Sequence, residues 1–323
     1  MTLSTLAAPH QPAPAEIKSM IRPMSKRDDW VNWLYLAGDW FIICGAIVFY
    51  LAVPGLLSYV LAVIIIGSRM RALGNLLHEA AHFKLFAERR LNNLAGTLLC
   101  SWPIFVCYRR YVADHILHHR NLWRNDSDPD LALYAMTGTE RSSRDTQAFS
   151  WFMVKHVILV IVPVLPLLRL AREAAGSRLR LAIVGGLMAT AAVLAAAAPG
   201  VVVKVVVLCW IVPWFTSFQC ITYWAELAEH GGLRDFGWNW GSRNWDGGWV
   251  TRWLIGSHSD DLYHLLHHWF PTVPHHRLRP LDAACRSVWP EYRNHQRCTG
   301  FFRSAGTGVS VMRDIWSGGT RFR

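Results

Sequence analysis

Three short segments of this chain carry histidines at spacings that suit a metal site. Two have the pattern H-x-x-H-H and the third has H-x-x-x-H. Residues i, i+3 and i+4 project from one face of a helix, so the imidazoles of each segment can point into a common space. Neutral imidazole is the commonest metal ligand in proteins. The eight residues are His78, His82, His115, His118, His119, His264, His267 and His268.

The number of these histidines predicts more than one metal ion. A catalytic zinc keeps three protein ligands and one open position, so eight imidazoles exceed what a single ion needs. Two metals are therefore expected. Imidazole suits zinc, copper, iron and nickel, and the ligand type alone leaves the metal open.

Two further residues are candidates for the same site. His230 directly follows a long apolar run and emerges at the depth expected of the other histidines, which predicts a ninth ligand. Glu226 lies four residues earlier on the same helix face and is expected to act through a ligand or a water molecule. Carboxylates often accept the second N–H of a metal-bound imidazole. Candidates for that role are Asp114, Asp260, Asp261 and the acidic turn at residues 126–130.

Composition indicates a membrane protein. Of the 323 residues, 52% are hydrophobic and only 17% are charged, which is too apolar for a simple soluble globule. The net charge of +11 comes from basic residues that flank apolar runs, a pattern that favours membrane anchoring over nucleic-acid binding. The seven cysteines lack C-x-x-C spacing and are expected to be buried small residues, without a disulfide or zinc framework.

Two helical hairpins are predicted to cross the membrane. Residues 34–53 and 56–66 form the first, around Pro54-Gly55. Residues 181–198 and 201–220 form the second, with a tight turn at Pro199-Gly200. Basic residues at one end of each hairpin place those ends in the cytoplasm. They are Lys26, Arg27, Arg69 and Arg71 for the first hairpin and Arg169, Arg172, Arg178 and Arg180 for the second.

A common metal site requires every histidine segment to lie on one side of the membrane, so two other apolar runs must not cross. Residues 91–106 contain two asparagines and Pro103 and are predicted to be re-entrant or interfacial. Residues 150–170 contain two prolines and are predicted to lie along the membrane interface. A helix over 109–121 is expected to carry the first H-x-x-H-H motif.

The predicted fold is all-α and integral to the membrane, with four transmembrane helices, interfacial helices and a cytoplasmic helical cap that carries the metals. Residues 1–29 are expected to be a disordered tail, 30–300 the membrane domain with its cap, and 301–323 a C-terminal tail. Asp39, inside the first run, is expected to reach the interface near a helix end. Four other histidines are not counted as ligands, namely His156, His258, His275 and His276.

The three histidine segments, separated by two predicted hairpins, resemble the histidine boxes of the integral-membrane fatty acid desaturase and hydroxylase superfamily. Residues 125–134 and 269–274, which follow the second and third boxes, are also similar, and the likeness covers about residues 70–290. It implies two non-haem irons that use O2 and two external electrons to attack an unactivated C–H bond. The ligands it implies are His78, His82, His115, His118, His119, His230, His264, His267 and His268.

One departure from the family pattern concerns Glu226. Members related to the acyl-CoA desaturases have asparagine four residues before the ninth histidine, where this chain has Glu226. A carboxylate there could bind iron directly or change the outcome of the reaction.

The third box and the Phe-Pro that follows it resemble the desaturating branch, which implies a double bond introduced into a lipid acyl chain. Hydroxylation begins with the same hydrogen abstraction and stays open as an alternative. The likeness also implies a separate electron donor, such as a ferredoxin or cytochrome b5 with its reductase, and a basic cytoplasmic face would suit an acidic donor. High Ala, Arg and Val usage favours a bacterial inner membrane, with the catalytic face in the cytoplasm.

Two other classes of protein compete with this interpretation. Residues 78–82 match H-E-x-x-H, the zinc metalloprotease motif, with Glu79 as general base. That interpretation leaves both H-x-x-H-H segments unexplained. A metal or haem transporter would need polar residues along its spans, and the predicted spans offer little beyond Asp39, His156 and Lys204.

Overall fold

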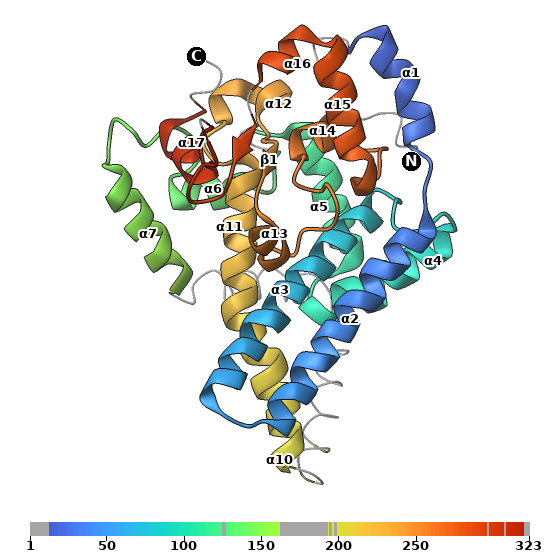
Figure 1. Ribbon diagram of the computed structural model, residues 1–323, viewed down its shortest axis with the longest axis vertical. Helices are drawn as coiled ribbons and strands as arrows, with labels where there is room; N and C mark the ends of the chain where they lie inside the picture. Colours follow the sequence, from blue (N-terminus) through green and yellow to red (C-terminus); the bar gives the residue numbers. More distant parts are fainter. Residues whose placement is uncertain are drawn as a thin grey trace.

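The computed structural model describes residues 13–124, 127–161, 193, 196, 199–295, 297–306 and 308–319. Most of this part is helical, which confirms the predicted helical class in outline. The two short strands it contains, β1 (Trp245–Asp246) and β2 (Cys298–Thr299), pair in parallel. Figure 1 shows long helices that extend downward from a region of short helices and loops.

The first predicted hairpin is present as α2 (Asp29–Ala52) and α3 (Leu56–Ala81). Both helices are long and apolar enough to cross a membrane. Large apolar side chains near the hairpin stay exposed, with Phe41 and Leu56 each at 80%. Exposed apolar surface of this extent on long helices fits contact with lipid.

The third long helix is built from α10 (Pro199–Val202), η4 (Val203–Ile211), η5 (Trp214–Phe218) and α11 (Gln219–His230). η4 and η5 are π-helical and flank Pro213, which cannot donate a backbone hydrogen bond. Pro199 and Gly200 begin this helix, so the predicted tight turn at these two residues is wrong. Proline costs little in a first helical turn, where its missing N–H would have no partner.

Other predictions for this part of the chain fall on segments that are only partly described. Of the first arm of the second hairpin, residues 181–198, all but 193 and 196 lie outside the described residues. Helix α7 (Phe149–Ile161) begins the 150–170 run, and residues 162–170 again lie outside. The interfacial position of this run stays a prediction.

Residues 89–104 form three short consecutive helices that pack against α3. These are α4 (Arg89–Ala95), η2 (Gly96–Ser101) and η3 (Trp102–Ile104). Tryptophans of neighbouring helices donate hydrogen bonds to their backbone carbonyls: Trp40 to Leu99 O, Trp210 to Pro103 O and Trp214 to Ile104 O. The segment is not among the helices long enough to span a membrane. Its re-entrant or interfacial position stays a prediction.

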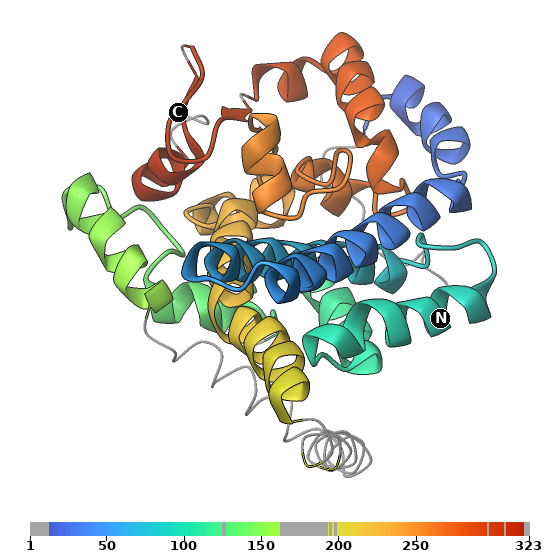
Figure 2. The same cartoon turned by 60° about the horizontal axis from the view of Figure 1, so that its bottom comes forward.

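Short helices and loops form the cap above α3 and α11, and Figure 2 shows them gathered around the ends of these two helices. The cap begins with α5 (Tyr108–Asn121), where the sequence predicted a helix. The others are α6 (Leu131–Thr137), η6 (Arg234–Phe236), α12 (Gly237–Trp240), α13 (Trp249–Leu254), α14 (His264–Trp269), η7 (His275–Arg277), α15 (Leu278–Val288) and α16 (Pro290–Asn294).

Both ends of the described chain differ from the expected tails. Near the start, α1 (Ala15–Met24) buries Ile17 in an apolar cluster with Leu281 and Trp289. Near the end, α17 (Val311–Ser317) buries Val311 and Ile315 against α11. A few apolar residues at helical spacing are enough to anchor a short helix on an existing core, and average composition does not reveal them.

Asp39 is buried, with 2% exposure, and does not reach the interface as expected. Its carboxylate lies 3.1 Å from Arg69 Nη1 on α3 and 2.9 Å from His258 Nε2. A charge inside an apolar helix is tolerated when a partner at the same depth neutralises it. His275 and His276 also contact the start of α2, through Asn32 and Asp28.

The seven cysteines are free within the described part of the chain. Cys100, Cys209, Cys285 and Cys298 are buried as expected, whereas Cys44 is exposed. His156 of α7 hydrogen-bonds with Tyr223 of α11, which agrees with its expected structural role.

Candidate metal centre

The histidines come together where four helices meet. His78 lies in the last turn of α3 and His82 caps its end. α5 supplies three histidines, α11 ends at His230 and α14 supplies the other three. All nine predicted ligands fall into two groups whose nitrogen atoms lie within 4.8 Å of one another. The first group is His78, His82, His115, His119 and His267, and the second is His118, His230, His264 and His268.

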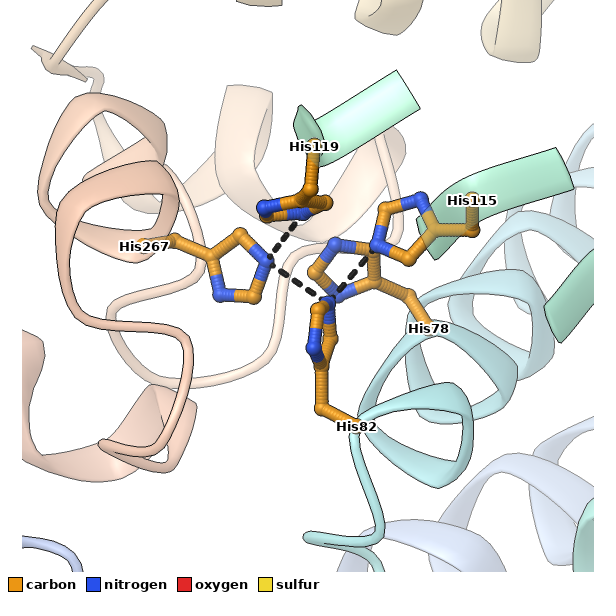
Figure 3. Close-up of side chains that lie close together, drawn as sticks. All are labelled: His78, His82, His115, His119 and His267. Atoms are coloured by element: carbon orange, nitrogen blue, oxygen red, sulfur yellow. Dashed lines mark hydrogen bonds between the residues drawn. The ribbon is translucent and has the colours of Figure 1, made fainter. Parts of the chain in front are cut away.

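The first group is shown in Figure 3, where the five imidazoles face a common centre. His82 Nε2 lies 2.7 Å from His115 Nε2 and 3.1 Å from His267 Nε2. His267 Nε2 is also 3.1 Å from His119 Nε2. His78 Nε2 is buried and has no hydrogen-bond partner among the residues described above.

The second group has the same kind of contact. His230 Nε2 lies 3.1 Å from His118 Nε2 and 3.0 Å from His264 Nε2, and His264 Nε2 lies 3.2 Å from His268 Nε2. Two ligand atoms each about 2.1 Å from one metal, at about a right angle, are about 3 Å apart. The spacing of these nitrogen atoms therefore suits metal ligands.

Each H-x-x-H-H helix serves both groups, which the prediction of one common space per motif did not anticipate. In α5 the i, i+4 pair His115 and His119 belongs to the first group, and His118 to the second. In α14 the assignment is reversed, because His267 alone joins the first group. A helix placed between two metals can bind each of them through side chains on a different edge of the same face.

The hydrogen bonds of His118 and His230 give a direct test of whether a metal fits. His118 Nδ1 donates to Asp128 Oδ1 at 2.9 Å, and His230 Nδ1 donates to Gly241 O at 3.0 Å. If both rings are neutral, their Nε2 lone pairs then face each other across 3.1 Å. Two facing lone pairs repel unless a positive charge lies between them. The residues present therefore fit a bound cation.

Nearby carboxylates favour positive charge at this place. Burial by itself lowers the pKa of His118, but Asp130 and Asp128 outweigh it and raise this pKa above its usual value. Burial by itself would raise the pKa of Asp128, but the hydrogen bond and charge of His118 and the backbone N–H groups of Trp123 and Asp130 lower it. Both aspartates come from the acidic turn that the sequence nominated. The other carboxylates predicted for this role have different partners: Asp114 contacts Arg110, Asp260 contacts Arg279 and Asp261 contacts Ser257.

Replacing Asp128 by asparagine is expected to weaken metal binding by about 10- to 100-fold, because the neutral amide orients and polarises His118 less well. Competition with a chelator measures this affinity. Asp145→Asn, at an exposed position outside both histidine groups, is the matched control and should change nothing. Equal affinity in the two variants would exclude a role for Asp128 in holding the metal.

Glu229, which the sequence did not single out, approaches the second group. Its Oε2 lies 3.8 Å from His264 Nε2, and its Oε1 accepts a hydrogen bond from Arg71 Nη2 at 3.1 Å. Glu226 is half-buried, and its backbone carbonyl accepts a hydrogen bond from Tyr134. Helical periodicity favoured Glu226 because it shares a face with His230. The site lies beyond the end of α11, however, and residues of the last turn reach it from more than one face.

A cavity of about 530 Å³ adjoins both groups. Histidines of both groups line it, together with Glu226 and Glu229. Its apolar wall comes from η3, α6 and the third long helix, and the lining includes Ile104, Phe105, Leu133, Trp214 and Phe218. A mainly apolar cavity beside candidate metal ligands can hold an apolar substrate.

Comparisons with known proteins agree with the resemblance seen in the sequence. The family model for fatty acid desaturases matches residues 54–300, a range that contains both histidine groups. A dihydrorhizobitoxine desaturase of Bradyrhizobium elkanii is 29% identical over 267 residues, which are 79% of this chain and 74% of that protein. With its apolar long helices and its buried histidine groups, the chain is a membrane oxidoreductase that belongs to the fatty acid desaturase family.

Proposed function

We propose that this protein is an O2-dependent desaturase that introduces a double bond into a fatty acyl chain at a histidine-ligated di-iron centre. The observation that carries the proposal is the convergence of nine buried or half-buried imidazoles into two groups beside one apolar cavity. The five-histidine group would hold one iron and the four-histidine group the other. Family membership supports iron, since the imidazoles themselves suit several metals.

Bound iron would supply the oxidising power, with O2 and two electrons, that removes two hydrogens from adjacent carbons of the chain. The balanced reaction consumes one O2, two electrons and two protons, and releases the alkene and two waters. The protein contributes orientation and a dry environment. Asp128 and Gly241 O fix the tautomers of His118 and His230, so that both Nε2 lone pairs are available.

We infer a topology of four crossings from the direction of the long helices. Both α3 and α11 run toward the cap and end at histidines of the metal groups. The chain must therefore return to the far end of the third helix between residues 82 and 199, and the apolar run 181–198 is the candidate for that crossing. Positively charged flanks favour a cytoplasmic cap, in a bacterial inner membrane.

The test of this function is product analysis. The purified iron-loaded protein is supplied with a reductase system, O2 and acyl lipids on different carriers, and mass spectrometry identifies the products. Alkenes are expected. Alcohols alone would favour hydroxylation, which uses the same first hydrogen abstraction. Because the relative is named for dihydrorhizobitoxine, that compound belongs in the substrate panel, and its oxidation in place of every acyl lipid would contradict a fatty acyl substrate.

The metalloprotease alternative accounts for fewer of these contacts. His78 and His82 share their group with three other imidazoles, which a zinc site with three protein ligands would leave unused. The Glu79 carboxylate, which would be the general base of a metalloprotease, accepts a hydrogen bond from the backbone N–H of His275 at 3.3 Å.

We propose that an acidic one-electron carrier protein docks on an open groove of the cap. The groove, of about 670 Å³, is lined by two tryptophans, Trp123 and Trp238, and by three arginines, among them Arg124, against one aspartate. Trp238 Nε1 donates to the backbone carbonyl of His119 at 2.7 Å. Trp123 Nε1 donates to Gly241 O at 3.0 Å, the same oxygen that binds His230. The groove thus offers hydrogen-bonded contact with ligand residues of both groups.

Arg124→Glu is expected to lower the donor-dependent kcat/KM by about tenfold at low salt, because like charge slows encounter with an acidic partner. Electron delivery by dithionite should be unchanged. Arg303→Glu, an exposed arginine that does not line the groove, is the matched control. Equal loss in both variants would place the docking surface elsewhere.

A further inference from the structure

Arg71, on α3, places a buried guanidinium in the wall of the cavity beside the second histidine group. Its side chain is only 11% exposed. Nη2 donates to Glu229 Oε1 at 3.1 Å, and Nη1 donates to Asn75 Oδ1. Its Nε is buried and has no hydrogen-bond partner among the described residues. Since Glu229 Oε2 is 3.8 Å from His264 Nε2, one carboxylate separates the guanidinium from that group.

Thr222, on α11, is a second unsatisfied donor in the same cavity wall. The residue is 8% exposed, and its Oγ1 is buried without a hydrogen-bond partner in the part of the chain that the structure describes. Arg71 precedes His78 by seven residues on α3, and Thr222 precedes His230 by eight on α11. At about 1.5 Å per residue, both Cα atoms lie about 10–12 Å before a candidate ligand, on helices that run toward the cap.

A methylene chain alone would leave these two donors unsatisfied. A buried N–H or O–H without an acceptor is destabilised relative to one exposed to water, and such groups in a binding cavity usually meet a ligand atom. The Arg71 guanidinium and the Thr222 hydroxyl can each donate a hydrogen bond to an oxygen atom. The positive charge of the guanidinium disfavours an ammonium group on the ligand. The apolar wall at Ile104, Trp214 and Phe218 remains available for the hydrocarbon part of the substrate.

We propose that Arg71 and Thr222 bind an oxygen acceptor of the substrate, either a carboxylate or an acyl carbonyl, and so fix the distance from that polar group to the carbon that is oxidised. The inference rests on the proposed desaturase function. It adds that the position of the double bond is set by its distance from the polar end of the substrate. Glu229 positions the guanidinium, and the apolar wall takes the chain.

A binding experiment tests this without turnover. The iron-loaded protein is titrated with decanoate, methyl decanoate and decane, and each variant is checked for its iron content. Arg71→Gln and Thr222→Val are each expected to weaken binding of decanoate and its ester by about tenfold, the loss of one hydrogen bond in a dry site, and to leave decane unaffected. If Arg71→Gln does not fold, Thr222→Val carries the test.

Thr216→Val is the matched control, because this threonine on the same long helix is exposed and donates a hydrogen bond to the Val212 carbonyl of its own helix. It should bind all three probes as the natural protein does. Tighter binding of decanoate than of its ester in the natural protein would identify a carboxylate, and equal binding an acyl carbonyl. Unchanged affinity for decanoate and its ester in Thr222→Val and Arg71→Gln, or an equal loss for decane, would overturn the proposal.

Product position supplies an independent readout. Acyl substrates of several lengths should all acquire the double bond at one position counted from the carbonyl carbon, and Thr222→Val should give a mixture of positions. A position that stays constant when counted from the methyl end would overturn the proposal. Failure to form an alkene from any acyl substrate would instead count against the desaturase function, since the binding experiment does not depend on it.

Discussion

Replacing His267 by alanine is expected to abolish turnover and to lower the bound iron by about one ion per chain. His267 Nε2 contacts both His82 and His119 at 3.1 Å, so its imidazole lies between residues of the first group that come from different helices. Without it, α14 contributes no ligand to that group. The second group keeps its four histidines and should retain its metal.

The measurement combines elemental analysis of the purified protein with protease protection in membranes. Insertion should be unchanged, because His267 lies in the cap and the long helices keep their apolar surfaces. His276→Ala is the matched control: its imidazole contacts Asp28 and belongs to neither group. If His267→Ala retained full iron and turnover, the assignment of the first group would be wrong.

Replacing Asp314 by alanine is expected to destabilise the protein by about 3–5 kcal/mol, because it leaves a buried guanidinium uncompensated. Asp314 and Arg243 are both fully buried, and Asp314 Oδ2 accepts hydrogen bonds from Nε at 2.9 Å and Nη2 at 2.7 Å. Arg243 also donates to the Ala228 and Gly231 carbonyls, on either side of His230. The variant should therefore also lose metal from the second group more readily.

Thermal unfolding in detergent, followed with and without a chelator, measures both effects. Asp235→Ala removes an ion pair with Arg141 in which both side chains are more than 60% exposed, and should cost less than about 1 kcal/mol. Equal shifts in the two variants would show that the buried pair does not hold α17 and the end of α11 together.

The ligand histidines could be predicted from the sequence because their signal is local. A spacing of three or four residues puts side chains on one helix face whatever the rest of the fold does. The assignment of His118 to a different group from His115 and His119 could not be predicted, because it depends on the rotation of α5 relative to α14. The same holds for Glu229, whose approach to His264 is set by where α11 ends.

Other differences also arise from contacts between elements distant in sequence. Asp39 is neutralised by Arg69 and His258, which lie on two other segments, so the cost of its burial cannot be judged from its own helix. Helices α1 and α17 pack on the cap because Ile17 and Ile315 contact apolar surfaces formed by distant residues. By contrast, the first hairpin and the short helices of residues 89–104 follow from runs of apolar residues and their interruptions, which the sequence displays directly.

The most direct test of the proposed centre is the metal content and coordination of the purified natural protein. Elemental analysis is expected to give two irons per chain, one for each histidine group. X-ray absorption at the iron edge should show nitrogen and oxygen ligands at about 2.1 Å, strong imidazole scattering and no sulfur. One zinc per chain with no iron would contradict the di-iron centre and favour the metalloprotease alternative.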